Sequence, residues 1–135
     1  MAIIHRFEDL EIWKKAQELS QKVYPLTFKE PIKSDFGIKD RMRGSIGSIM
    51  DNIAEGFERS SRPEFLNSLS ISKGETGELN SQLFRCFDNQ YITVELVSEL
   101  YNLANQLTKM LTSFISYLNS SKTKGQKYKN RSTNE

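Results

Sequence analysis

The fold of this chain is decided by residues 94–119, VELVSELYNLANQLTKMLTSFISYLN. Apolar side chains recur there in alternating steps of three and four residues, at Val97, Leu100, Ala104, Leu107, Leu111, Phe114 and Leu118. A repeat of about 3.5 residues is typical of a helix that packs lengthwise against other helices. Thr93 is the expected N-cap, and Glu95 lies near the positive end of the helix. This stretch therefore predicts one long helix of a bundle.

Three earlier stretches also have helical periodicity, whereas no stretch shows the sustained alternation of a β-strand. They predict helices over residues 10–29, 35–58 and 62–88. Their expected core-facing residues are Ile12, Ala16, Leu19, Val23 and Leu26; Met42, Ile46, Ile49, Ile53 and Gly56 or Phe57; and Phe65, Leu69, Ser72, Thr76, Leu79, Leu83 and Cys86.

Residues at the helix ends support these boundaries. We expect N-caps at Asp9, Ser34 and Ser61, the last within a capping box that includes Glu64. Pro25 should kink the first helix or end it early, because proline cannot donate a backbone hydrogen bond. The connections are about five, two and four residues long, which forces neighbouring helices to run antiparallel. The predicted fold is all-α, an antiparallel up-down-up-down four-helix bundle.

The 135 residues suit one domain, with the bundle in residues 1–119 and a basic tail in residues 120–135. The tail has one acidic residue, Glu135, and a net charge of +4, which leaves −2 for the bundle because the whole chain carries +2. The cations of the tail are Lys122, Lys124, Lys127, Lys129 and Arg131. A solvated, disordered end and a tether for nucleic acid are both open interpretations of such a tail.

The residues that most enzymes need are scarce. His5 lies before the first helix and Cys86 lies on a core stripe, which argues against a zinc site, a Glu-x-x-His di-metal motif and a histidine-activated nucleophile. No phosphate-binding Gly-Lys-Ser/Thr loop occurs. No run approaches the roughly 18 apolar residues of a membrane span, and residues 1–6 lack a signal pattern. We therefore expect a cytoplasmic, non-enzymatic protein without a cofactor or small-molecule substrate.

The last predicted helix carries more apolar surface than one core-facing stripe needs. Beside that stripe lie further side chains at intervals of seven residues, and two more on the opposite flank. They are Leu96, Leu103, Met110 and Tyr117, and then Tyr101 and Ile115. The rest of the helix is polar but has little charge, a composition that favours a protein interface. Self-association through Leu96, Tyr101, Leu103, Met110 and Tyr117 is the preferred hypothesis; a deep core in a monomer is the alternative.

The second and third predicted helices contain Gly44, Gly47, Gly74 and Gly77. Glycine costs about 1 kcal/mol relative to alanine within a helix. Close approach of two helix backbones would offset this cost, and room for a ligand is the alternative. We expect close helix packing, because no catalytic side chains accompany the glycines.

Nucleic-acid binding is the one activity for which side chains are available. Arg41, Arg43 and Arg59 could join the tail cations in sequence-tolerant contacts to phosphates. Acidic residues stand among them, at Asp40, Asp51, Glu55 and Glu58. The carboxylates Asp51, Glu55 and Glu58 could also meet across a helix turn, and acid–base chemistry there is the least favoured hypothesis.

The segment Asn52-Ile53-Ala54-Glu55-Gly56 resembles a known family, the four-helix-bundle proteins encoded in intervening sequences of bacterial 23S ribosomal RNA genes. The similarity extends over most of residues 7–118. Its further elements are Phe7 with residues 10–16; Phe36-Gly37-Ile38; Arg41-Met42-Arg43, Ser48-Ile49 and Arg59; and Glu64-Phe65, Leu69, Ile71, Gly74, Glu78-Leu79 and Gln82-Leu83. The chain departs from the family pattern at Gly44, where an arginine is usual, and at Met50, Glu75 and Asn80.

The resemblance implies a homopentamer of four-helix bundles and offers no established reaction. It also implies distant kinship with the accessory variability proteins of diversity-generating retroelements, which bind nucleic acid and a reverse transcriptase. We expect Asn52, Glu55, Gly56 and Glu78 to form structural contacts between helices or subunits. The leading hypothesis is a self-assembling scaffold with weak nucleic-acid binding, and the alternative is a dedicated RNA or reverse-transcriptase partner.

Overall fold

The structure is a computed structural model that describes residues 3–59 and 61–120. In this part of the chain the α-helices are α1 (Glu11–Val23), α2 (Phe36–Glu58), α3 (Arg62–Asp88) and α4 (Val94–Ser120). Short 3-10 helices precede α1 and connect it to α2: η1 (Phe7–Asp9), η2 (Tyr24–Phe28) and η3 (Ile32–Ser34). The described residues form no strand element, so the all-α class is confirmed. The predicted basic tail lies outside the described residues, apart from Ser120.

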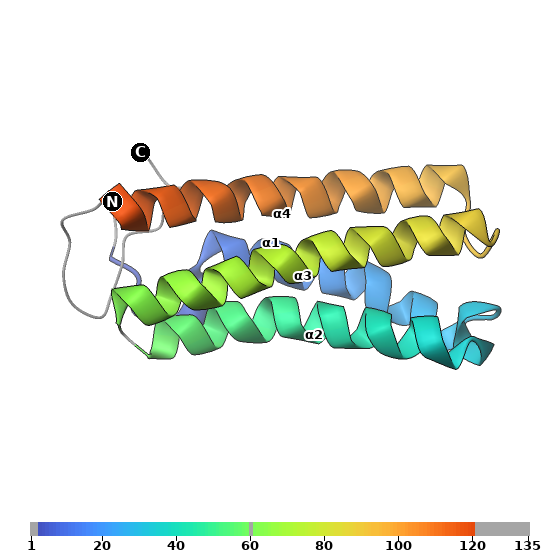
Figure 1. Cartoon of the computed structure of the whole chain (residues 1–135), viewed down its shortest axis with the longest axis horizontal. Helices are drawn as coiled ribbons and strands as arrows, with labels where there is room; N and C mark the ends of the chain where they lie inside the picture. The colour runs from blue at the N-terminus through green and yellow to red at the C-terminus, as the bar shows by residue number, and fades with distance from the viewer. Residues whose placement is uncertain (1–2, 60, 121–135) are drawn as a thin grey trace.

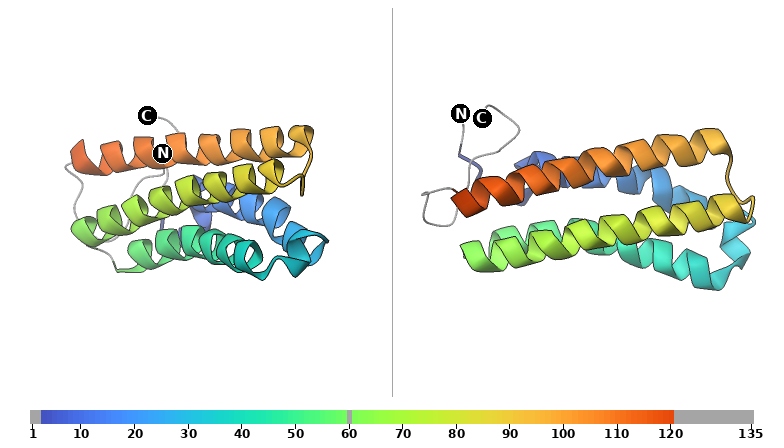
Figure 2. Two further views of the ribbon diagram at one scale, coloured as in Figure 1. Left: turned by 45° about the vertical axis from the view of Figure 1, so that its right-hand side comes forward. Right: turned by 45° about the horizontal axis from the view of Figure 1, so that its top comes forward.

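The four helices lie side by side as rods that run in alternating directions (Figure 1). Helix α1 contacts α2 and α4, and α3 contacts the same two helices, so the order along the chain is also the order around the bundle. Two further views show the same arrangement, with α1 shorter than the other three (Figure 2). The predicted up-down-up-down topology is therefore confirmed.

The core lies along the bundle axis, where the predicted stripes meet. All stripe residues of α2, α3 and α4 are buried, including both Gly56 and Phe57. Phe65 packs edge to face against Phe57 and Phe114, with ring centroids 6.0 and 5.7 Å apart. These rings join three helices near one end of the bundle. None of the described helices combines the length and the apolar character needed to cross a membrane.

Two of the expected N-caps are confirmed and two are wrong. The Ser61 hydroxyl accepts from the Glu64 backbone N–H, and the Thr93 hydroxyl accepts from that of Leu96. The N-cap of α2 is Asp35 rather than Ser34, because the Asp35 carboxylate accepts from the Ile38 backbone N–H. The cap position of α1 is occupied by Leu10, since Asp9 already belongs to the preceding turn η1.

The first predicted helix is shorter than expected. Helix α1 ends at Val23, and the chain continues as the 3-10 helix η2 through Pro25. Proline has no N–H to donate to the preceding turn, so the α-helical hydrogen bonding stops there. The Thr27 hydroxyl instead donates to the Tyr24 carbonyl at 2.7 Å, which stabilises the tighter turn. The early stop predicted from Pro25 is thus confirmed, while residues 24–28 are not α-helical.

Candidate interaction surfaces

The bundle itself covers most of the apolar excess predicted on α4. Leu103 is buried, and Leu96, Met110, Ile115 and Tyr117 are half-buried against the core of their own chain. Of the five residues predicted to contact a second copy, only Tyr101 is classed as exposed, at 38%. The neighbouring helices α1 and α3 flank α4 on both sides, so they cover a wider sector of it than one stripe. The surface available to a partner on α4 is therefore smaller than the spacing of its residues indicated.

An aromatic pair lies on the surface between α3 and α4. Phe84 of α3, 43% exposed, contacts Tyr101 of α4 with ring centroids 5.1 Å apart. One helix turn along the same seam, the Asn80 amide donates to the Asn105 side-chain oxygen at 3.4 Å. The sequence reasoning missed Phe84, because it assessed α3 only for its core-facing stripe. An exposed ring pair in a seam with little charge is a feature of protein interfaces.

The four helical glycines do not serve close packing within the described chain, so the close approach of two helices expected at these positions does not occur between helices of one copy. A Cβ added to Gly44, Gly47, Gly74 or Gly77 would find no contacting atom within 4 Å. On α3, Gly74 and Gly77 lie between Ser70 and Ser81 in steps of four, three and four residues, and all four are exposed. We call these four residues the α3 outer strip; it is small, uncharged and open to a second helix.

The residues of the family-like segment contribute mainly to the contact between α2 and α3. Gly56 permits a close approach of the two helices, because a Cβ there would lie 2.6 Å from the Ser68 Cβ. The Arg59 guanidinium bridges Glu55 of its own helix, at 3.0 Å, and Glu64 of α3, at 3.3 Å. These carboxylates raise the pKa of Arg59, above all through the hydrogen bond to Glu55. All three groups are about half-exposed, so the bridge contributes little stability but orients the side chains.

Asn52 of α2 and Glu78 of α3 lie on the outer surface along which these two helices meet. The Asn52 amide donates to the Ser48 carbonyl at 2.8 Å and to its hydroxyl at 3.0 Å, within α2. Glu78 of α3 lies 3.9 Å from Arg41 of α2. An open surface hollow of about 410 Å³ lies beside the Arg59 bridge, lined by residues that include Asn52, Asn67 and Ile71. Its charged lining residues are those of the bridge itself, Glu55, Arg59 and Glu64, and no cluster of three metal-binding side chains occurs among the described residues.

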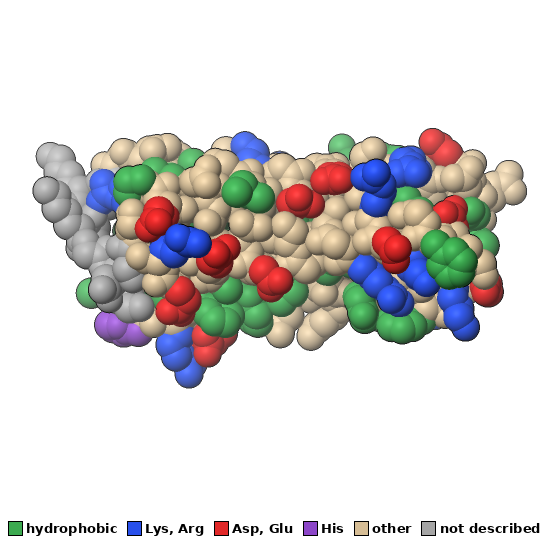
Figure 3. Space-filling model, turned by 60° about the horizontal axis from the view of Figure 1, so that its bottom comes forward, with side chains coloured by type: hydrophobic (Ala, Val, Ile, Leu, Met, Phe, Trp, Pro, Cys, Tyr) green, Lys and Arg blue, Asp and Glu red, His purple; other side chains and the backbone are tan. Residues whose placement is uncertain are grey.

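The three arginines predicted to contact nucleic acid do not converge. Arg41 and Arg59 are 18 positions apart on α2, which separates them by about 27 Å along the axis. Each lies beside a carboxylate, whereas Arg43 points toward η2, where its Nε donates to the Thr27 hydroxyl at 2.8 Å. The space-filling view shows cations and carboxylates intermixed at both ends of this face, with hydrophobic side chains beside them (Figure 3). The tail cations lie outside the described residues.

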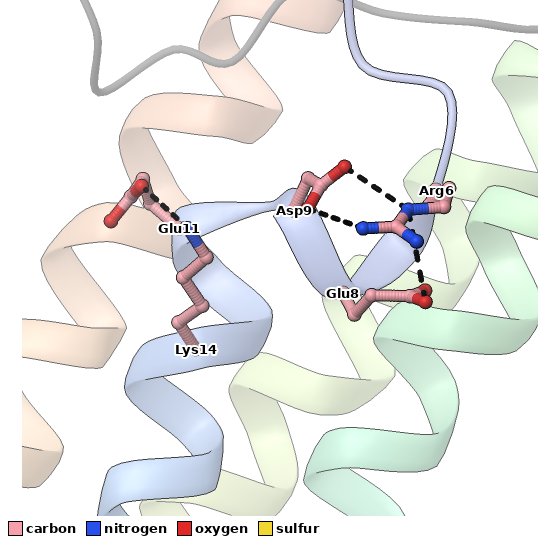
Figure 4. A network of polar contacts seen from close by, with 5 residues as sticks. All are labelled: Arg6, Glu8, Asp9, Glu11 and Lys14. Atoms are coloured by element: carbon pink, nitrogen blue, oxygen red, sulfur yellow. Dashed lines mark hydrogen bonds and ion pairs between the residues drawn. The ribbon is translucent and has the colours of Figure 1, made fainter.

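A network of charged side chains surrounds the start of α1 (Figure 4). Arg6 forms ion pairs with Asp9 at 3.4 Å and with Glu8 at 3.9 Å, while Lys14 pairs with Glu11 one turn further on. The hydrogen bond to Asp9 is the main cause of the raised pKa of Arg6. These groups are solvent-exposed, and each of the two cations is paired with a carboxylate, so the network offers no unpaired cation.

Three titratable groups elsewhere have perturbed pKa values: Cys86, Glu75 and Tyr91, whose hydrogen bond to Asp35 raises its pKa. Cys86 is buried, its Sγ lies 3.7 Å from the Met42 Sδ, and desolvation raises its pKa to about 11. The thiol is therefore neutral at physiological pH and a poor nucleophile. Partial burial, followed by the charge of Glu78, raises the pKa of Glu75. Glu75 does not line the hollow beside Arg59, so this carboxylate pair does not supply an active site there.

Comparisons with known proteins identify relatives of this arrangement. The model of a family described as 23S rRNA-intervening sequence protein matches residues 8–113. A solved structure from Bacteroides thetaiotaomicron, described as a protein with unknown function from the S23 ribosomal protein family, has 27% sequence identity and a TM-score of 0.70. The match covers 77% of this chain and 97% of that one. No functionally curated protein matches the chain.

Proposed function

The chain belongs to the 23S rRNA-intervening sequence protein family, and from that premise we propose that it is a non-enzymatic scaffold that assembles from copies of itself. The relative with a solved structure is described as having unknown function, and no catalytic family is indicated, so membership supplies no reaction. The proposal therefore rests on surfaces rather than on an active site.

The open glycines are the observation that carries this proposal. Each glycine within a helix costs about 1 kcal/mol relative to alanine. Gly56 offsets its cost through its contact with Ser68, but Gly74 and Gly77 have open space where a side chain would be. A second copy that packs its own helix against the α3 outer strip would give these glycines a role, because small residues let two backbones approach closely.

The exposed pair Phe84 and Tyr101 supports the same assignment. The two rings lie on the α4 side of α3, and Val94 is also exposed near the start of α4. Aromatic side chains surrounded by uncharged residues commonly anchor protein interfaces. We propose five copies, the number that the family resemblance implies, arranged as a closed ring.

The experiment replaces Gly77 by leucine, which fills the open space with a good helix former. We expect Gly77→Leu to reduce the mass measured by light scattering to that of one chain, 15.6 kDa, while the helical circular dichroism stays unchanged. Gly37→Leu is the matched control, because a Cβ there meets only an ordinary contact at 3.8 Å and lies in the first turn of α2. Equal masses for both variants and the wild type would exclude the strip as an interface.

Sequence-tolerant nucleic-acid binding is a second candidate, and one contact favours it. Arg43 lies over two exposed aromatic rings, a combination that proteins use to bind unpaired bases and phosphates. A dedicated RNA or reverse-transcriptase partner would belong to this class. It predicts an affinity for RNA that falls steeply as salt rises, and that is lost when Arg41, Arg43 and the tail lysines are replaced. Absence of salt-sensitive binding at low ionic strength would refute it.

A further inference from the structure

Three exposed aromatic rings lie at the end of the bundle where the chain passes from α1 to α2. Tyr24 and Phe28 come from η2, and Phe36 is the first residue of α2. They are 43%, 55% and 67% exposed, respectively. Phe36 and Phe28 are the most exposed of the large apolar side chains in the described residues. Surface rings of this size cost free energy in water, so this grouping calls for a role.

Cations are held directly over these rings. The Arg43 guanidinium carbon lies 4.4 Å from the centroid of Phe28 and 5.1 Å from that of Tyr24. The two rings meet edge to face, with centroids 5.2 Å apart. The hydrogen bond from Arg43 Nε to the buried Thr27 hydroxyl fixes the guanidinium in this position. The Lys39 ammonium lies 4.5 Å from the centroid of Phe36. We call Tyr24, Phe28, Phe36, Lys39 and Arg43 the aromatic-cationic patch.

Neither cation of the patch is held in an ion pair by a described residue. Within the described part of the chain, neither Arg43 nor Lys39 has a carboxylate oxygen within 4.0 Å, in contrast to Arg41 and Arg59. Two further lysines, Lys29 and Lys33, are exposed in the same connection and have no such partner either.

The described acidic residues of this connection keep their negative charge, but none forms an ion pair with Arg43 or Lys39. Glu30 accepts from the Ser34 hydroxyl at 2.7 Å. Asp35 caps α2 and also accepts from the Tyr91 hydroxyl at 2.8 Å. Asp40 is exposed one residue after Lys39. Lys29, Lys33, Lys39 and Arg43 outnumber these three carboxylates by one, so the segment has a small net positive charge next to flat apolar rings.

We propose that the aromatic-cationic patch binds single-stranded nucleic acid. Unpaired bases would stack on Phe28 and Phe36, whose other faces are open, and phosphates would contact Arg43, Lys39 and Lys29. This inference rests on the second candidate function, nucleic-acid binding, and assigns that binding to a surface of the bundle rather than to the tail. It does not depend on self-assembly.

The test is fluorescence anisotropy of the full chain with a fluorescein-labelled 15-nucleotide oligo(U) at low salt. We expect Phe28→Ala and Phe36→Ala each to weaken binding about tenfold, and Lys39→Gln to reduce the salt dependence. Ile71→Ala and Lys109→Gln are matched controls, because they remove an exposed large apolar side chain and an exposed lysine elsewhere; both variants should bind as the wild type does. Thermal melts verify that each variant is folded.

A second experiment distinguishes nucleic-acid binding by the patch from binding by the tail. The second experiment uses a full-length variant in which glutamine replaces Lys122, Lys124, Lys127, Lys129 and Arg131. In this background, Phe36→Ala should still weaken binding of oligo(U) about tenfold. A duplex of the same length should bind more weakly than the single strand, because its bases are already stacked. If the tail variant abolishes binding while patch variants have no effect, the patch is excluded but nucleic-acid binding as a function survives.

The remaining outcomes would overturn the proposal more broadly. No binding by the wild type at low salt would exclude both the patch and the second candidate function. Sedimentation with vesicles of phosphatidylcholine and phosphatidylglycerol tests the competing partner, a lipid surface. Binding to vesicles that is lost in Phe36→Ala, without binding to oligo(U), would assign the patch to membranes instead.

Discussion

Gly56 of α2 lies directly against Ser68 of α3, with no room for a side chain between the two helices. A Cβ at position 56 would lie 2.6 Å from the Ser68 Cβ and 3.0 Å from a ring carbon of Phe65. Such distances are shorter than van der Waals contact allows, so any side chain at position 56 would force α2 and α3 apart. The other glycines within these helices have no such neighbour.

Replacing Gly56 by alanine should therefore destabilise the fold. We expect Gly56→Ala to lower the free energy of unfolding by about 1–3 kcal/mol, the usual cost of overpacking. The measurement is urea denaturation at a fixed protein concentration, since assembly would make stability concentration-dependent. Gly37→Ala, which creates only an ordinary contact, should cause no loss. Similar stabilities for the two variants would show that α2 and α3 are not in close contact at Gly56.

Replacing Gln90 by glycine should stabilise the fold. Gln90 follows α3 with a positive φ of 63°, a conformation that costs residues with a Cβ. The Gln90 N–H donates to the Phe87 carbonyl and the Tyr91 N–H to the Cys86 carbonyl, the hydrogen-bond pattern of a helix end closed by a left-handed residue. We expect Gln90→Gly to raise the free energy of unfolding by about 0.5–1 kcal/mol, as measured by denaturation with urea. A loss of stability would contradict this geometry.

The thiol of Cys86 should make stability fall at alkaline pH. Its pKa is raised from 9.0 to about 11 in the folded chain. Between these values the unfolded chain loses the thiol proton while the folded chain keeps it, so ionisation favours unfolding. The contribution of the neutral thiol is complete below pH 9 and declines as pH rises toward 11. We expect a loss of up to about 1 kcal/mol per pH unit in this window.

Cys86→Ala provides the control for this pH dependence, because tyrosines and lysines titrate in the same range. The variant starts from a lower stability, owing to the cavity that it leaves, but should lose less between pH 9 and pH 11. The comparison uses urea denaturation of both proteins at several pH values. Parallel curves for wild type and variant would show that Cys86 does not contribute.

The core could be predicted from the sequence because it depends on local periodicity alone. Stripes such as Leu100 to Leu118 repeat at helical spacing, and every member is buried. Local periodicity could not decide whether Ser34 or Asp35 is the N-cap of α2. Both residue types can cap a helix, and Asp35 is additionally held by Tyr91, which lies 56 residues away in the sequence.

The aromatic-cationic patch was missed for a related reason. Tyr24 and Phe28 were assigned to a continuous α-helix, in which their positions relative to Arg43 are undefined. The 3-10 turn through Pro25 places both rings beside Arg43, 16 residues after Thr27. Likewise the apolar residues of α4 could be counted from the sequence, but the share covered by α1 and α3 depends on how the helices pack.

The central claim of this account is that the chain assembles with copies of itself, and the molar mass in solution tests it most directly. Multi-angle light scattering coupled to size exclusion should give a mass near five times that of the 15.6 kDa chain, unchanged on dilution through the micromolar range. A mass of one chain across that range would contradict the account, because the open glycines of α3 would then face only water.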